Sequence, residues 1–220
     1  TGTNLAQVPV FLASAMICLA SSVGIPDPAM PCSANLGLIG AMYAHLGRDP
    51  APLRLMQTHA PRVFRWVERM NMAETFVDDT TSTDGGLLDA EALPDTLLQV
   101  MRFIADDYLP EITAHVERAN AWLGNNPEIE TGASTNSKSM AKGLGLAPFT
   151  WRGAEIETVV IPYRFYLLQR LLDAVGDTSD ADRASIDALF DRTGLANLLN
   201  LKTDRRMERE NNQEVWGETQ

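Results

Sequence analysis

Residues 36–46 constrain the fold of this chain most, because they are apolar almost all the way round a helix. A surface helix normally keeps one polar face, so a helix without one belongs at the centre of a bundle or in a membrane. This run is too short to span a bilayer. Gly37, Ala41 and Ala44 are small residues on one side of the helix, where neighbouring backbones can approach closely. The sequence therefore predicts a buried central helix with the other helices packed around it.

A second feature is the order of residues on both sides of this helix. Pro31, Ala34 and Asn35 precede it, residues 43–50 form its end and the turn after it, and residues 60–70 follow. This order resembles the C-terminal helical domain of glutathione transferases, closely over residues 31–70 and more loosely over residues 93–195.

The start of the central helix departs from that family pattern. Family members have a capping box there, in which a hydroxyl and a carboxylate satisfy free backbone amides at the helix N-terminus. In this chain the two positions are Cys32 and Asn35, so the carboxylate is missing and a thiol replaces a good capping hydroxyl.

The resemblance implies a fold and a division of labour. The fold would be all-α: a helical bundle of the glutathione transferase C-terminal type with a helical extension and one small β-hairpin. In that family an N-terminal thioredoxin-like domain activates the thiol and binds glutathione, while the helical domain contributes the pocket for a hydrophobic acceptor and much of the homodimer interface. No strand-helix-strand pattern of that kind precedes Pro31. Glutathione would thus be a co-substrate of the parent family that this chain alone does not bind, and we expect no cofactor.

Composition narrows the class of partner. The chain has 220 residues, a formal net charge of -11 and a pI of about 4.7. This charge argues against nucleic acids and anionic membrane surfaces, both of which need a basic contact area. The two cysteines, Cys18 and Cys32, have no metal-binding or redox spacing. A cytoplasmic protein is the expectation.

The N-terminal region allows two interpretations. Residues 1–26 carry no charge, and residues 10–20 form an apolar run that invites comparison with a signal peptide. The basic segment that starts a signal peptide is missing, so we favour a buried helix over residues 11–23, ended by Gly24. The chain also has no initiator Met and resembles a fragment that lacks its N-terminal partner segment.

Periodicity and turn residues divide the rest of the chain. We expect residues 1–74 to hold the core of the helical domain, 75–92 a linker, 93–200 a helical extension and 201–220 a frayed, charged tail. Pro110 should split a long helix near Leu109. A hairpin is predicted near residues 149–158, with Gly153 in its turn, and Ser179 should start a late helix through a capping box.

Several motifs with catalytic or metal-binding potential have simpler interpretations. Residues 132–139 miss a phosphate-binding P-loop because Ser137 replaces its second glycine, and an irregular loop is the better interpretation. The three histidines, His45, His59 and His115, lack the helical spacing of metal ligands. Paired acids such as Asp106 and Asp107 are interpreted as solvated, and no nucleophile-base arrangement is evident.

The remaining candidates are aromatic residues that can line an apolar pocket. Tyr43, Tyr108 and Tyr163 combine apolar area with a hydroxyl that can orient a ligand. They are the weak substrate-binding candidates, and no catalytic or metal-binding residue is proposed.

Two further functions remain open beside glutathione conjugation or thiol transfer with the missing domain. The first is a stand-alone, non-catalytic helical interaction module, since such domains also serve in protein assembly. The second is a secreted helical protein, whose mature chain would begin near Ser22.

Overall fold

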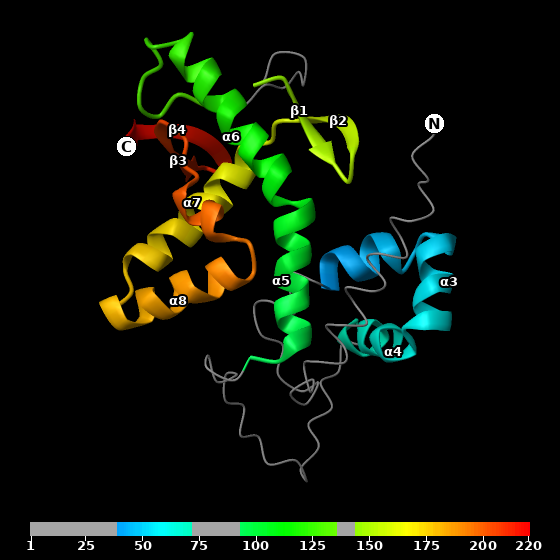
Figure 1. Cartoon of the computed structure of the whole chain (residues 1–220). Helices are drawn as coiled ribbons and strands as arrows, with labels where there is room; N and C mark the ends of the chain where they lie inside the picture. Colours follow the sequence, from blue (N-terminus) through cyan, green and yellow to red (C-terminus); the bar gives the residue numbers. More distant parts are fainter. Residues whose placement is uncertain (1–38, 72–92, 136–143) are drawn as a thin grey trace. The chain divides into compact units, whose positions relative to one another are not determined.

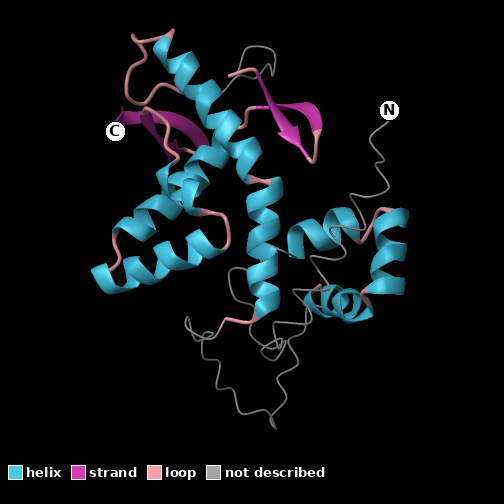
Figure 2. Ribbon diagram, viewed as in Figure 1, coloured by secondary structure: helices cyan, strands magenta, loops and turns pink. Residues whose placement is uncertain are grey.

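The structure of the chain is a computed structural model that describes residues 39–71, 93–135 and 144–220. The expectations for the first helix, for Cys32 and Asn35, and for the linker at 75–92 fall wholly or almost wholly outside these residues. Backbone contacts divide the chain into two compact units, residues 1–100 and 101–220. Each unit has its own hydrophobic cluster. Figures 1 and 2 show the elements of each unit.

Before α5 (Asp95–Asp107), the described residues of the first unit form the helical elements η1 (Met42–Leu46), α3 (Pro50–His59) and α4 (Pro61–Met70). Proline opens both α3 and α4, at positions where the missing backbone N–H has no helical partner. Asp49 caps α3 by accepting a hydrogen bond from the Ala51 backbone N–H. Six buried residues of this unit form a hydrophobic cluster: Met42, Met56, Ala60, Val63, Trp66 and Val67.

The predicted burial of the central helix is wrong for its described part. Gly40, Ala41 and Ala44 are exposed, and of η1 only Met42 is buried. A side chain added at Gly40 would meet nothing within 4 Å. The described part of the run therefore packs through one face. Its other face consists of apolar residues but is not buried. Small residues such as alanine and glycine cost little free energy when they are exposed.

Helices α5 (Asp95–Asp107) and α6 (Leu109–Gly124) follow, and α5 runs across the boundary between the units. Their separation confirms the predicted split at Pro110, which lies in the first turn of α6. Helix α6 buries a single face with helical spacing: Ile112, His115, Val116, Ala119 and Leu123.

The predicted hairpin is present as β1 (Leu146–Trp151) and β2 (Ala154–Val159), an antiparallel pair. Its two turn residues, Arg152 and Gly153, have φ of 50° and 81°, as a tight two-residue hairpin turn requires. Ala147 and Phe149 lie on the buried face of β1, which packs on α6.

Helices α7 (Pro162–Gly176) and α8 (Asp180–Arg192) and the short η4 (Ala196–Asn200) follow the hairpin. Ser179 accepts a hydrogen bond from the Asp182 backbone N–H and donates its hydroxyl to the Asp182 carboxylate, which confirms the predicted helix start. Gly194, with φ of 79°, follows the end of α8.

The predicted frayed tail is wrong. Residues 201–220 contain a second antiparallel hairpin, β3 (Arg205–Glu210) and β4 (Gln213–Thr219). Its turn residues, Asn211 and Asn212, have φ of 49° and 62°, a conformation that asparagine tolerates better than most residues. The hairpin contributes Met207 and Trp216 to the core cluster, and its Val215 is also buried.

Strand β4 also pairs with part of the segment expected to be an irregular loop. Ser134 forms an antiparallel bridge with Val215, and the Thr135 backbone N–H donates to the Glu214 carbonyl at 2.9 Å. The described residues of the P-loop-like segment are therefore fixed along the second hairpin.

These hairpins overturn the all-α fold class. The described chain is mixed, with a helical core and two small antiparallel sheets of two strands each (Figure 2). In the second unit α6, α7 and both hairpins share one hydrophobic cluster, which contains Phe165 and Trp216 among its largest members.

Candidate functional site

Of the three predicted tyrosines, only Tyr108 lies beside a buried polar group. Tyr108 is the residue between α5 and α6, and it is half-buried against the core of the second unit. Tyr163 lies in the same unit at the start of α7, where 40% of it is exposed. Tyr43 belongs to the first unit. The structure does not place Tyr108 and Tyr163 in a common aromatic pocket.

The polar group beside Tyr108 is built on the buried face of α6. Glu111 and His115 are one helical turn apart, so both project on the same side. Because Ile112, Val116 and Ala119 fill the rest of that face, this acid and this imidazole are surrounded by apolar side chains. His115 is fully buried, and the Glu111 side chain is 16% exposed.

Two other elements complete this group, which we call the Glu111 cluster: Tyr108, Glu111, His115, Thr158 and Arg164. Thr158 from β2 lies between the acid and the imidazole. Its hydroxyl donates to Glu111 Oε1 at 2.9 Å and lies 2.8 Å from His115 Nε2. Arg164 from α7 forms an ion pair with Glu111, with Nη1 2.7 Å from Oε1, in a geometry that is not that of a hydrogen bond. The Glu111 cluster thus joins α6, the first hairpin and α7.

The hydrogen-bond directions in the Glu111 cluster define the state of His115. Because Thr158 gives its only hydroxyl hydrogen to Glu111, it accepts from His115, which places the imidazole hydrogen on Nε2. The other ring nitrogen, Nδ1, is buried and has no hydrogen-bond partner within the described ranges. Burial lowers the pKa of His115, Glu111 opposes that shift, and Arg164 adds to it. His115 is therefore neutral at pH 7.

Tyr108 is also held in its neutral form. Burial raises the pKa of Tyr108 above its usual range, Arg164 acts in the opposite direction and Glu111 reinforces the rise. A neutral phenol can donate or accept a hydrogen bond and so orient a ligand, but it cannot act as a base. The Glu111 cluster is thus suited to supporting the packing of its helices and to orienting a ligand. Its partly exposed acid, Glu111, is already bound by Thr158 and Arg164.

Tyr163 belongs to an aromatic and cationic surface on α7. Its ring stacks on Tyr166 with centroids 6.0 Å apart, and the Arg209 guanidinium from β3 lies 5.1 Å from the Tyr163 ring centroid. Tyr43 has a similar contact, with the Arg48 guanidinium 5.4 Å from its ring centroid. Both contacts engage the ring faces, which are the surfaces that an apolar ligand would use.

The other sequence candidates have ordinary structural surroundings. His45 and His59 are exposed. Asp107 forms a bidentate ion pair with Arg152 in the first hairpin turn, at 2.8 and 3.0 Å. Among the residues that the structure describes, no group of histidine, cysteine or acidic side chains has the arrangement of a metal site.

Sequence reasoning identified Tyr108 but missed the rest of the Glu111 cluster. One signal was present: Glu111 and His115 interrupt an apolar face at helical spacing, which indicates a buried polar pair. Thr158 and Arg164 carry no comparable signal, because their position depends on how the hairpin and α7 pack on α6.

Comparison with known proteins identifies no relative of this chain. No family model matches the chain, and neither a curated protein nor a solved structure matches it. In the part of the chain that the structure describes, no helix is both long and apolar enough to cross a membrane.

Proposed function

We propose that this chain is the helical domain of a glutathione transferase-like protein, in which it contributes to acceptor binding and assembly while another domain activates the thiol. The observation that supports the proposal is the sequence resemblance over residues 31–70. Within its described part, the runs on both sides of His59 form helices α3 and α4, each opened by proline, around a shared cluster that includes Trp66.

The chemistry of the described residues is compatible with this division of labour. Conjugation needs a donor that stabilises the glutathione thiolate, because the thiolate is the attacking species. Burial raises the pKa of Tyr108, so its hydroxyl is a weaker hydrogen-bond donor to a thiolate than an unperturbed phenol would be. Its proposed role is to orient an acceptor from the edge of the Glu111 cluster.

Activity measurements on two proteins test the proposal. The chain alone should show no conjugation of glutathione to an aryl halide acceptor and no micromolar glutathione binding by calorimetry. The same chain joined to a thioredoxin-like domain that binds glutathione should show both. In the joined protein, Tyr108→Phe should change the KM for the acceptor more than that for glutathione. Saturable micromolar binding of glutathione by the chain alone would overturn the proposal.

A second candidate function, a non-catalytic interaction module, is favoured by a different observation. Four large apolar side chains near the base of the first hairpin and the start of α7 are 40–50% exposed: Leu146, Ile161, Tyr163 and Leu167. Exposed apolar groups of this kind mark interaction surfaces when they are contiguous. Tyr163 and Leu167 are one helical turn apart and share a face of α7.

Sedimentation velocity at increasing protein concentration tests this candidate in its simplest form, a homodimer. Self-association that Leu167→Glu abolishes, and that the exposed control Asp180→Lys leaves intact, would favour the interaction module. A chain that stays monomeric at high concentration would count against self-association through this surface.

A further inference from the structure

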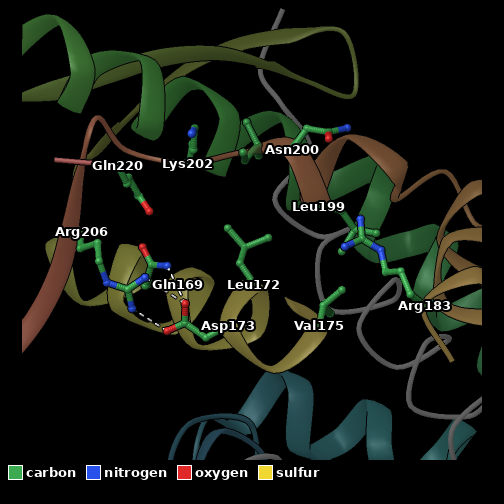
Figure 3. A pocket seen from close by; sticks show the side chains of 11 residues that line it. Gln169, Leu172, Asp173, Val175, Arg183, Leu199, Asn200, Lys202, Arg206 and Gln220 are labelled. Carbon is green, nitrogen blue, oxygen red and sulfur yellow. Dashed lines mark hydrogen bonds and ion pairs between the residues drawn. The ribbon is translucent and has the colours of Figure 1, made fainter. Parts of the chain in front are cut away.

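The second unit contains an open pocket of about 260 Å³ along the C-terminal half of α7, bordered by α8, η4 and the start of the second hairpin (Figure 3). Drug-sized ligands occupy pockets of about 300 Å³ or more, so this pocket fits a smaller molecule. Its apolar surface comes from Leu172 and Val175 on α7 and from Leu199 on η4. None of its lining residues belongs to the Glu111 cluster.

One of the three basic residues that line the pocket is paired with two acids. Arg206 on β3 contacts both carboxylate oxygens of Asp173, at 3.0 and 2.7 Å, and also binds Glu208 at 2.9 Å. The Asp173 carboxylate also accepts a hydrogen bond from Gln169, whose side chain is buried. These contacts fix the wall between α7 and β3. They also balance the charge of Arg206 with two carboxylates, so Arg206 attracts an added anion only weakly.

The other two basic residues retain donors. Lys202 lines the pocket and has no ion pair within the described residues. Arg183 is bound to Asp187 through Nε at 2.8 Å, which leaves its terminal nitrogens available. Figure 3 shows Lys202 above Leu172 and Arg183 to its right, well apart from each other, so a single small head group would contact one of them. Because the charge of Arg183 is balanced by Asp187, Lys202 is the stronger attractor.

We propose that this pocket binds a small organic monocarboxylate, with the carboxylate at Lys202 and a short apolar body over Leu172, Val175 and Leu199. The charge of the whole chain strengthens the inference. A protein with a net charge of -11 repels anions in general, and an unpaired lysine beside an apolar pocket offsets that repulsion locally. The proposal goes beyond the function above and does not depend on glutathione chemistry.

Titration of the full chain with hexanoate, followed by NMR of the backbone amides, tests the proposal. Hexanoate should shift the amides of Leu199 and Lys202 in a saturable manner, and hexanol should bind at least about fivefold more weakly because it lacks the charge. The affinity for hexanoate should fall as salt is raised. Equal binding of the two probes, or saturable shifts confined to other regions, would overturn the proposal.

Two variants and one control identify the residues responsible. Lys202→Gln should lower the affinity for hexanoate about fivefold or more while leaving hexanol binding unchanged. Leu172→Ala should weaken both probes, because it removes apolar contact area. Arg54→Gln makes the same change in charge on α3 of the first unit, where Arg54 is exposed, and should leave both affinities unchanged. Unchanged hexanoate binding in folded Lys202→Gln, as judged by its NMR spectrum, would refute the assigned site.

Discussion

Trp122 on α6 and Trp216 on β4 stack with their ring centroids 6.1 Å apart and their planes inclined by 16°. This contact joins a helix from the middle of the chain to the last strand, and Trp216 is only 1% exposed. The second hairpin is therefore part of the hydrophobic core of its unit. A stacked aromatic pair contributes about 0.5–1.5 kcal/mol beyond the area that it buries.

Trp216→Ala should consequently lower the free energy of unfolding of the second unit by about 3–5 kcal/mol, because it leaves a large cavity and removes the stacked pair. Urea denaturation followed by circular dichroism measures the change. Glu218→Ala, two residues further along the same strand at an exposed position, is the control and should change stability by less than about 0.5 kcal/mol. A frayed terminus would give equally small effects for both variants.

The same hairpin shows why part of the fold was predicted and part was not. Local signals identified the first hairpin through Gly153, the helix break at Pro110 and the cap at Ser179, because each acts within a few residues. Residues 205–219 are mostly charged or polar, and this composition hides a short strand-like alternation of apolar and polar residues. Met207, Val215 and Trp216 are buried there, while Arg206 forms ion pairs with Glu208 and with Asp173.

The candidate site was predictable only where its residues share one helix. Glu111 and His115 form a pattern that can be read from sequence, whereas their partners Thr158 and Arg164 follow more than forty positions later in the chain. The error at residues 39–46 has a different cause. Apolar composition indicates which residues can be buried, but the number of neighbouring elements decides which faces are covered.

Thr158→Val should destabilise the second unit by about 1–3 kcal/mol. The change keeps the shape of the side chain but removes the hydroxyl that links His115 to Glu111, which leaves a buried N–H without a partner. Thr150→Val is a matched control on the same hairpin, where the exposed threonine hydroxyl binds the exposed Glu155, and water can replace that contact. Comparable losses for the two variants in denaturant titrations would contradict the buried network.

The Glu111 cluster also predicts how stability depends on pH. The pKa of His115 is below 6.5 in the folded state, mainly through burial, and rises to about 6.5 when the chain unfolds. Between these two values the unfolded state binds the proton and the folded state does not, so stability falls as the pH decreases through this window. Above about pH 6.5 both states are neutral at His115, and its contribution no longer changes.

Urea denaturation of the wild type and of His115→Gln from about pH 8 to about pH 5 checks this expectation. The slope of unfolding free energy against pH should be smaller in the variant, although the variant is less stable at every pH. Asp173, whose pKa is lowered chiefly by its hydrogen bonds to Arg206, acts in a more acidic range and does not interfere. Parallel profiles for the two proteins would show that His115 titrates normally in the folded state.

Two glycines provide the last prediction, because the same Gly→Ala change should have opposite effects at them. At Gly217, a buried residue of β4, an added Cβ would lie 2.9 Å from Glu208 Cγ and 3.1 Å from Arg206 Cβ, so the two strands of the second hairpin would have to shift. Overpacking of this kind costs about 1–3 kcal/mol. At Gly40 the added Cβ meets nothing within 4 Å and lies in a helical turn, so alanine should be neutral or stabilising by up to about 1 kcal/mol.

Amide hydrogen exchange measures the local stability around each of these two glycines. Gly217→Ala should reduce protection of the amides in β3 and β4, and Gly40→Ala should preserve or increase protection in η1 and the turn before it. Loss of protection around Gly40 in the alanine variant would contradict the exposed position of Gly40 in the structure. It would favour the closely packed central helix that the sequence pattern indicates.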